Sequence, residues 1–365
     1  MRFSGFDNDY RKSTLGDIFE YERPDKYIVL SEKYHNEYST PVLTANQAFI
    51  LGYTNETEGI YDKGPVILFD DFTCDMKFAD FPFKVKSSAM KLLTPKSETP
   101  IFYAYSLLQH INYQPKGHAR HWISIMQPIP VMMPDNAEQK KISDFLILVN
   151  AKIEKQRKLI ENLKKYKRGL NIRLLSGISM SYSKRLGDVC SIIGGGTPDT
   201  TTAKFWDGGI NWFTPSEIGK TKYVVSSVRS ISYDGMLKSS AKLLPQNTVL
   251  LTTRATLGEM SILHAEATTN QGFQSLIPSN ELLAEYVYYL QVIIKPWCEK
   301  YASGNTFREI SKSALSNCVI PVPDISIQNK IVRVLSGIDQ HIERENDILD
   351  KLREQKKALL QQLFI

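Results

Sequence analysis

The chain has 365 residues and a formal net charge of +6, and 42% of its residues are hydrophobic and 10% aromatic. This length can hold two ordinary domains, and the composition lets each domain build a hydrophobic core. No two of the four cysteines have CxxC spacing, no apolar run reaches membrane-spanning length, and the start lacks the features of a signal peptide. We therefore expect a cytoplasmic protein without a metal site, a disulfide framework or a membrane segment.

The first part of the chain, residues 1–137, is predicted to be a mixed α+β domain. Short apolar runs bounded by turn residues, such as residues 64–69, are typical of β-strands. A longer apolar stretch, Ile101–Ile111, predicts a helix. Prolines at positions 130 and 134 then suit a sharp exit from the domain just before a helix start.

A long helix is predicted next, over residues 138–177. Apolar residues recur there in alternating steps of four and three, the period of a left-handed coiled coil. At about 1.5 Å per residue the apolar seam is roughly 50 Å long. The polar residues Gln156 and Lys167 occupy two further positions of the same series. The apolar seam residues are Ile142, Leu146, Val149, Ile153, Ile160, Leu163, Leu170 and Leu174.

This helix is strongly basic. Residues 138–175 contain eleven Lys or Arg and four Asp or Glu, a net charge of +7, which exceeds that of the whole chain. The cluster at residues 164–168 (Lys-Lys-Tyr-Lys-Arg) can contact an anionic partner, or it can be an ordinary solvated helix face. The sequence leaves both interpretations open.

A second α+β domain is predicted over residues 178–324, with strands such as residues 248–252 and a helix over residues 282–294. Three consecutive glycines at positions 194–196 open a Thr-rich loop that ends in Lys204-Phe205-Trp206, and Trp212 and Phe213 follow. Hydroxyls, lysines and aromatics interleaved in turns suit a surface that contacts phosphates and bases. The alternative is that the aromatic rings pack the loop or the core.

A second long helix is predicted over residues 325–365, and it repeats the first at an offset of 189 residues. Its polar seam residues, Glu345 and Lys356, fall in the same register as Gln156 and Lys167. Its apolar seam residues are Ile331, Leu335, Ile338, Ile342, Leu349, Leu352, Leu359 and Leu363.

The repeat predicts two units, each a globular domain followed by a long helix. Equivalent units related by a two-fold axis bury equivalent faces, which favours an antiparallel coiled coil with a pseudo-two-fold internal repeat. In that register Glu345 could lie near Lys167, as a register device; the alternative is that the polar seam residues are merely tolerated. The fold class is therefore α+β: two globular α/β domains separated by two long helices.

Several motifs of enzymes are missing. Residues 214–221 are a near miss for a P-loop, but Thr214 replaces the first glycine and Pro215 stiffens the loop. The glycines at 194–196 do not form GxGxxG, no NPPF- or DPPY-type tetrapeptide of an amino-methyltransferase is present, and the six histidines show no metal spacing. Aspartates at positions 70, 71 and 75 could form an acid or metal site, but the second domain has no counterpart to them. We expect a binding protein without catalytic residues.

An ordered set of short strings runs through the whole chain: residues 2–6, 15–17, 194–198, 269–272, 304–310 and 320–323, the last leading to Gln328 and Ile331. With the two domains and two helices, this set resembles the specificity subunit of type I restriction–modification systems. Glu138-Gln139 has the family's usual form, whereas Ile327-Gln328 departs from it without disturbing the heptads.

The resemblance implies that each globular domain is a target-recognition domain that reads one half of a split double-stranded DNA site. The helices would form the spacer and dock two methyltransferase subunits, which bind S-adenosylmethionine and methylate adenine N6. Restriction (motor–nuclease) subunits would join through the complex, and this chain would bind no cofactor itself. A different possibility is a coiled-coil scaffold with protein- or carbohydrate-binding domains; a standalone nuclease or methyltransferase is disfavoured by the missing motifs.

Polar, basic and aromatic residues of the loops are the candidate DNA contacts, because such side chains read base edges and hold phosphates. In the first domain they are Tyr34, His35, Asn46, Gln47, His118, Arg120 and His121. In the second they are Lys204, Trp206, Trp212, Lys220, Lys222 and Arg254.

Overall fold

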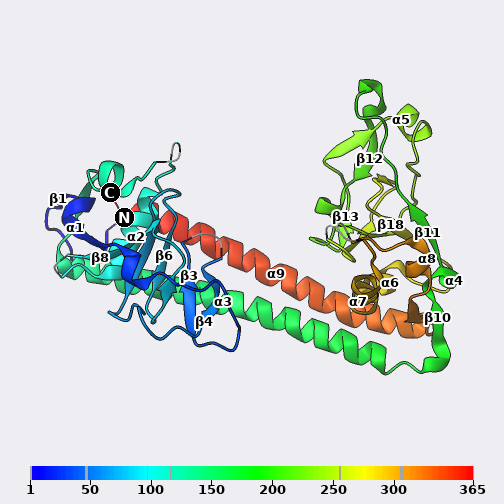
Figure 1. Cartoon of the computed structure of the whole chain (residues 1–365), viewed down its shortest axis with the longest axis horizontal. Coiled ribbons are helices and arrows are strands. Elements are labelled where there is room, and N and C mark those ends of the chain that lie inside the picture. Colours follow the sequence, from blue (N-terminus) through cyan, green and yellow to red (C-terminus); the bar gives the residue numbers. More distant parts are fainter. Residues whose placement is uncertain are drawn as a thin grey trace. The chain divides into compact units, whose positions relative to one another are not determined.

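The structure is a computed structural model that describes residues 2–45, 48–96, 98–115, 117, 119–254, 256–304 and 308–364. Two compact units divide the chain: residues 1–158 together with 346–365, and residues 159–345. The two long helices, α3 (Asn136–Ser176) and α9 (Ile325–Leu363), each contribute one half to each unit (Figure 1).

The globular part of the first unit contains three sheets. The strands β1 (Arg11–Thr14) and β9 (Pro130–Met133) pair antiparallel. A four-stranded antiparallel sheet has the order β2-β8-β5-β6, formed by Phe19–Glu22, Met90–Pro95, Val66–Asp70 and Met76–Ala79. A three-stranded sheet has the order β4-β3-β7, formed by Ile50–Thr54, Thr40–Leu43 and Lys84–Val85, with β3 and β7 parallel.

Short helices connect these strands. Thr14 and Asp17 form a capping box that starts α1 (Leu15–Ile18), and a 3₁₀ turn, η1, spans Pro24–Tyr27. The helix α2 (Ile101–Ile111) has the bounds that the sequence predicted, and it ends at Asn112 in the left-handed region. A π-helical turn, η2 (Trp122–Met126), precedes β9.

The second unit repeats this plan. Its strands β10 (Ser183–Arg185) and β19 (Val319–Pro321) pair as β1 and β9 do. A five-stranded sheet has the order β11-β18-β15-β16-β13, formed by Cys190–Gly194, Gln274–Pro278, Val249–Leu251, Met260–Leu263 and Tyr223–Val224. A three-stranded sheet has the order β14-β12-β17, formed by Arg229–Ile231, Trp206–Phe213 and Thr268–Thr269, with β12 and β17 parallel.

Helical elements complete the second unit. The predicted helix over residues 282–294 is two helices, α6 (Ala284–Tyr289) and α7 (Gln291–Tyr301), which meet at Leu290. The remaining elements are η3 (Met180–Tyr182), α4 (Leu186–Val189), η4 (Ala203–Phe205), η5 (Pro215–Glu217), α5 (Tyr233–Leu237) and α8 (Lys312–Ser316). The shared sheet plan confirms the α+β fold with an internal repeat that the sequence predicted.

The long helices pack antiparallel within each unit. In the first unit, Ile142 and Leu146 near the start of α3 share a core with Leu360 and Leu363 near the end of α9. In the second unit, the end of α3 packs against the start of α9, with Leu175 beside Leu335 in one core. Every predicted apolar seam residue is buried or half-buried, and burying a Leu or Ile side chain contributes roughly 1.5–3 kcal/mol.

Two details of the helix pair differ from the sequence predictions. Lys167 forms its ion pair with Asp339, whereas Glu345 lies 3.1 Å from His341 on its own helix, so the predicted Lys167–Glu345 register device is wrong. The most buried position also shifts by one residue near the C-terminal end of each long helix. Leu175 and Leu360 are more buried than the predicted Leu174 and Leu359, because each end also packs against a globular core.

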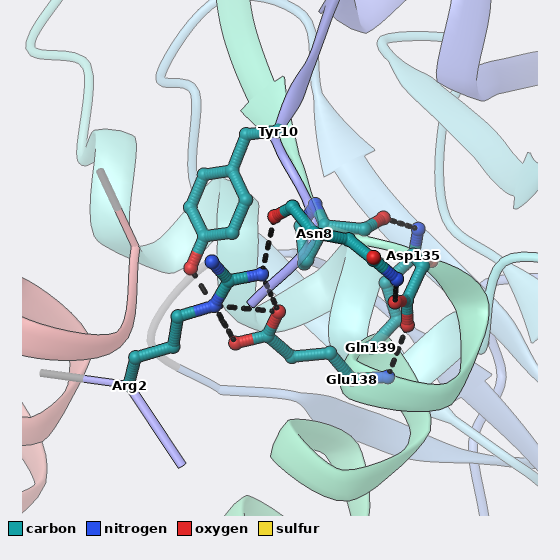
Figure 2. Close-up of polar contacts among 7 residues, drawn as sticks. Arg2, Asn8, Tyr10, Asp135, Glu138 and Gln139 are labelled. Carbon is teal, nitrogen blue, oxygen red and sulfur yellow. Dashed lines mark hydrogen bonds and ion pairs between the residues drawn. The ribbon is translucent and has the colours of Figure 1, made fainter. Parts of the chain in front are cut away.

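A polar junction fixes the start of α3 to the first domain (Figure 2). The buried carboxylate of Glu138 accepts from the guanidinium of Arg2, with Nη2 to Oε2 at 2.8 Å, and Tyr10 Oη is 3.5 Å from Oε1. Asp135 accepts from the backbone N–H of Glu138 at 2.9 Å and from the Asn8 amide at 2.8 Å. A buried carboxylate is stable only when it is paired, so these bonds hold the N-terminal segment on the helix.

The glutamines at the two helix starts have the same function. Gln139 donates to the carbonyl of Pro134 at 2.9 Å, and Gln328 donates to the carbonyl of Pro323 at 2.8 Å. Gln328 also donates to the Glu281 carbonyl and accepts from the Leu283 N–H.

None of the helices in the described ranges combines the length and apolarity that a membrane-spanning segment requires.

Candidate nucleic-acid interface

Two tryptophans of the second domain pack its three-stranded sheet. Trp206 and Trp212 are 8% and 5% exposed, and their rings meet edge to face with centroids 5.1 Å apart. Trp212 Nε1 donates to the Gly196 carbonyl at 2.8 Å, and Trp206 Nε1 donates to the Asp199 carbonyl at 3.1 Å. The prediction that these rings contact DNA is therefore corrected: they hold the glycine-rich loop in place from inside.

The exposed cation of this sheet is Arg229, which the sequence analysis missed. It lies on β14 opposite Trp212, and its guanidinium carbon is 3.6 Å from the centroid of the Trp206 ring. Stacking on an aromatic face orients the guanidinium while its N–H groups stay available for a bidentate acceptor. Strand pairing creates this arrangement, so the sequence gives no local signal for it. Lys204 of η4, which the sequence predicted as a contact, is exposed as well.

Lys222 is not available as a DNA contact, contrary to the prediction. Its ammonium is 2.9 Å from Glu285, 3.2 Å from Tyr289 Oη and 2.9 Å from Ser336 Oγ of α9. Burial alone would raise the pKa of the Glu285 carboxyl, but the hydrogen bonds from Lys222 and Tyr223 hold that pKa below its usual value. The ion pair therefore joins Lys222 to α6, and the hydrogen bond to Ser336 joins it to α9.

Two other predicted cations of the second domain reach the surface. Lys220 is exposed in the turn that follows η5. Arg254 is exposed and pairs with Glu309, with Nε to Oε2 at 3.0 Å. Exposed pairs of this kind contribute about 0–1 kcal/mol, so Arg254 can exchange its partner for a phosphate at little cost.

The first domain presents fewer of its predicted contacts. Tyr34 is half-buried against Gly52, where a Cβ would come within 2.6 Å of the Tyr34 Cβ, and Lys86 Nζ is 5.9 Å from its ring centroid. His35 is exposed and its ring is 5.4 Å from that of Tyr38. The predicted contacts Asn46, Gln47 and His118 lie outside the described residues.

His121 lies in the interior of the first domain, whereas Arg120 lies on its surface. His121 is 1% exposed, and its backbone N–H and ring Nδ1 both lie 3.1 Å from acceptors of Asp71. Its predicted DNA contact is therefore corrected, because the side chain is enclosed by the domain. Arg120 is exposed, with its guanidinium carbon 5.9 Å from the Phe72 ring, and remains a candidate.

The aspartates at positions 70 and 71 have structural roles. Asp71 Oδ1 accepts from the backbone N–H of Trp122 at 2.8 Å, and Asp71 Oδ2 is 3.4 Å from Lys91 Nζ, both side chains being 3% exposed. Asp70 accepts from the N–H groups of Phe72 and Thr73 at 2.9 Å. Within the described ranges no group of His, Cys, Asp and Glu side chains could hold a metal ion.

The outer faces of the long helices carry exposed apolar residues. Leu159 of α3 is 41% exposed, and Ile348, its counterpart at the 189-residue offset in α9, is 43% exposed. Such side chains are candidate contacts for a partner where they adjoin one another. Other exposed apolar residues of the two helices are Ile147, Leu148, Tyr166, Ile172, Ile325 and Val334.

The chain matches a family model described as the type I restriction modification DNA specificity domain, over residues 7–165 and 181–354. It is 34% identical over 379 residues to the type I restriction enzyme EcoR124I/EcoR124II specificity subunit of Escherichia coli, with 95% of this chain and 92% of that protein covered.

Two solved structures share its fold. One is the S subunit of a type I restriction–modification system from M. genitalium, at 16% identity, a TM-score of 0.54 and coverage of 100% of this chain and 97% of that chain. The other comes from work on complex assembly and conformational transition of the type I R-M system, at 17% identity, a TM-score of 0.63 and coverage of 98% of both chains.

Proposed function

Because the chain belongs to the family of type I restriction–modification specificity subunits, we propose that its two globular domains read the two unlike halves of a split double-stranded DNA site. The specificity subunit is the non-catalytic member of such a system. Reading of DNA by this chain then depends on binding groups alone, which are loop side chains for base edges and cations for phosphates.

The observation that carries the proposal is one sheet plan used twice with different loops. Both units have a two-stranded ribbon, a larger sheet whose central strands pair antiparallel, and a three-stranded sheet with one parallel pair; the larger sheet of the second unit adds a fifth strand, β13, parallel to β16. The loops differ: the glycine-rich loop that Trp206 and Trp212 hold in the second domain has no counterpart string in the first. Similar frames with unlike reading loops suit an asymmetric site.

The helices would serve as spacer and docking surface. With 41 and 39 residues, each has a rise of about 60 Å, which exceeds one DNA turn of about 34 Å, so bases between the two halves can be spanned without being read. The exposed apolar residues on the outer helix faces suit helical segments of two methyltransferase subunits.

In the proposed complex those methyltransferase subunits bind S-adenosylmethionine and methylate adenine N6, and restriction subunits join through them in the cytoplasm. The present chain contributes recognition residues: Arg229, Lys204, Lys220 and Arg254 in the second domain, and His35 and Arg120 in the first. All six side chains are exposed.

Sequencing of methylated adenines tests the proposal. A host that carries this chain with the methyltransferase subunit of its system should acquire N6-methyladenine at one two-part motif with unlike halves and a fixed gap. A single uninterrupted motif, or a palindrome, would contradict the two-reader proposal. If the assembled proteins bind DNA with no dependence on sequence or salt, a scaffold for proteins or carbohydrates is the better function.

A further inference from the structure

A basic pocket lies where the second domain meets the helices, entirely within residues 159–345. The pocket encloses ≈ 400 Å³. Lys164, Lys167, Arg168 and Asn171 of α3 line one side, and their i, i+3, i+4, i+7 spacing places them on a single helix face. Lys220 lines another side, from the turn after η5. Part of the basic cluster of α3 is therefore the wall of a cavity and not simply a solvated face.

Three of these cations have no ion-pair partner among the residues that the structure describes. Lys164, Arg168 and Lys220 are exposed and form no ion pair with any described residue. Lys167 differs, because Asp339, the carboxylate that lines the pocket, pairs with it and also accepts from Tyr289 Oη at 2.6 Å. The pocket therefore has a surplus of three positive charges on facing walls.

The Lys220 wall is held in place by its turn. Gly219 has φ +85°, and a Cβ there would come within 2.8 Å of Glu259 Oε2, so only glycine fits. Its backbone N–H donates to Ser261 Oγ at 3.1 Å. On the neighbouring side, Lys222 is bonded to Glu285, Tyr289 and Ser336. The turn thus fixes the backbone that carries Lys220 at the edge of the pocket.

We propose that this pocket binds a phosphate group, shared between the second recognition domain and the spacer helix. A phosphate has several acceptor oxygens, and a guanidinium and two ammonium groups can approach them from different sides. The proposal rests on the DNA-recognition function in naming the DNA backbone as the source of that phosphate; free inorganic phosphate is the other source. A contact of this kind carries no sequence information and sets the register of the reading domain on the duplex.

The test compares two variants of the full chain, alone and assembled with its methyltransferase subunits. The pocket variant carries Lys164→Gln, Arg168→Gln and Lys220→Gln, which keep most of each side-chain stem and remove the charge.

The control variant carries Lys152→Gln, Lys155→Gln and Lys165→Gln, which remove the same charge from exposed positions of α3 that do not line the pocket.

DNA affinity is measured from 50 to 200 mM salt on cognate and unrelated duplexes. For each backbone phosphate the pocket holds, the slope of log K against log salt should become shallower by about 0.9 in the pocket variant beyond the control. The loss should be equal on both duplexes, and the methylated motif should not change. Melting temperatures of the free proteins establish that both variants fold.

Inorganic phosphate is the second probe. If DNA affinity is unchanged but 10 mM-range phosphate raises the melting temperature of the parent and control proteins and not of the pocket variant, the pocket takes free phosphate. If the pocket variant changes neither the salt dependence of DNA binding nor the melting response to phosphate, the pocket proposal is overturned. If, in addition, the variant no longer binds the methyltransferase subunits, the cations belong to a site for an acidic protein partner instead. Because the parent protein's sequence-specific binding is recorded in the same series, failure of the recognition function is seen separately.

Discussion

Lys356 and Lys167 occupy equivalent positions in the two halves of the chain. The side chain of each contacts a residue of the other long helix, and these two contacted residues are equivalent as well. Lys356 Nζ is 2.9 Å from Asn150 Oδ1, and Lys167 pairs with Asp339. Both pairs of positions are related by the 189-residue offset of the repeat: Asn150 corresponds to Asp339, and Lys167 corresponds to Lys356. One half of the pseudo-symmetric seam therefore has an ion pair where the other has an amide.

Asn150→Asp should stabilise the first unit, because Lys356 has only amide oxygens as close partners and burial lowers its pKa, although Glu154 opposes that shift. The bond to Asn150 is already assisted by the charge of Lys356, and a carboxylate acceptor would add an ion pair worth on the order of 1 kcal/mol. The new carboxylate would have a depressed pKa in the fold, so the gain is present at pH 7 and is lost as pH falls through that pKa, below about 4. Thermal unfolding at pH 7 and pH 3 measures this. A gain that persists at pH 3 would contradict the charge mechanism, and Asp339→Asn is the reverse control.

Leu352→Lys should weaken the helix pair, because Leu352 is buried in the seam. Removing a Leu-sized side chain from a core typically costs about 2–5 kcal/mol, and a buried unpaired ammonium adds to that cost. Glu354→Lys, two residues further and exposed, should be nearly silent. Binding to a full site should fall more than binding to an isolated half-site. Equal melting shifts for the two variants, or equal losses on full and half sites, would refute the paired-helix spacer.

Asp71→Ala should destabilise the first domain by about 3–5 kcal/mol, because it leaves Lys91 buried without its counter-charge and frees the N–H group of Trp122, whereas the His121 N–H keeps its bond to the backbone carbonyl of residue 71. The double change Asp71→Ala with Lys91→Met should recover part of the loss, since the unpaired charge is gone. Denaturant unfolding of the parent, the two single variants Asp71→Ala and Lys91→Met, and the double variant gives the coupling energy. Additive losses would show that the two side chains do not act as a pair.

Arg229→Ala should reduce discrimination at one base position in the second half-site by about 1–3 kcal/mol if the stacked guanidinium contacts a base edge. Arg229→Lys should not restore it, because an ammonium lacks the planar fork that Trp206 orients. Competition binding against single-base variants of the site is the measurement. An equal loss on every sequence would assign Arg229 to the backbone, and Lys204→Ala is the comparison for that outcome.

Exchange of residues 15–126 for those of another family member should change only one half of the methylated motif. The two domains have separate sheets and cores, with Phe19 and Ile67 in one core and Val249 and Leu276 in another, so their reading loops can vary independently. Methylated-base sequencing reads the result. A change in both halves at once would show that the domains do not read separately.

The long helices could be predicted because their signal is local: a 3.5-residue apolar period needs no knowledge of the partner. The helix α2 was predictable for the same reason, since an uninterrupted apolar stretch ends at Asn112. The partner of Lys167 was not, because the stagger of two helices depends on how both ends pack against their domains.

The tryptophans show the same limit at the candidate interface. Composition correctly drew attention to the loop around Trp206, yet it could not tell a ring that contacts DNA from one that holds the loop. Arg229 and Trp212 are seventeen residues apart in the chain. They become neighbours only because β14 pairs with β12. Lys222 looked like a loop cation until the fold placed Glu285 beside it.

The core of the first unit is assembled from distant parts of the chain: Phe364 lies against Tyr103 and His110, with ring centroids 5.1 and 5.6 Å apart, and Leu360 and Leu363 share that core. Ribosomes deliver a chain from its N-terminus, so this core cannot be completed before Leu360, Leu363 and Phe364 have been made. The second unit is continuous in sequence from 159 to 345 and can close earlier. We therefore expect the usual order of vectorial folding, in which the N-terminal domain finishes first, to be inverted in this chain.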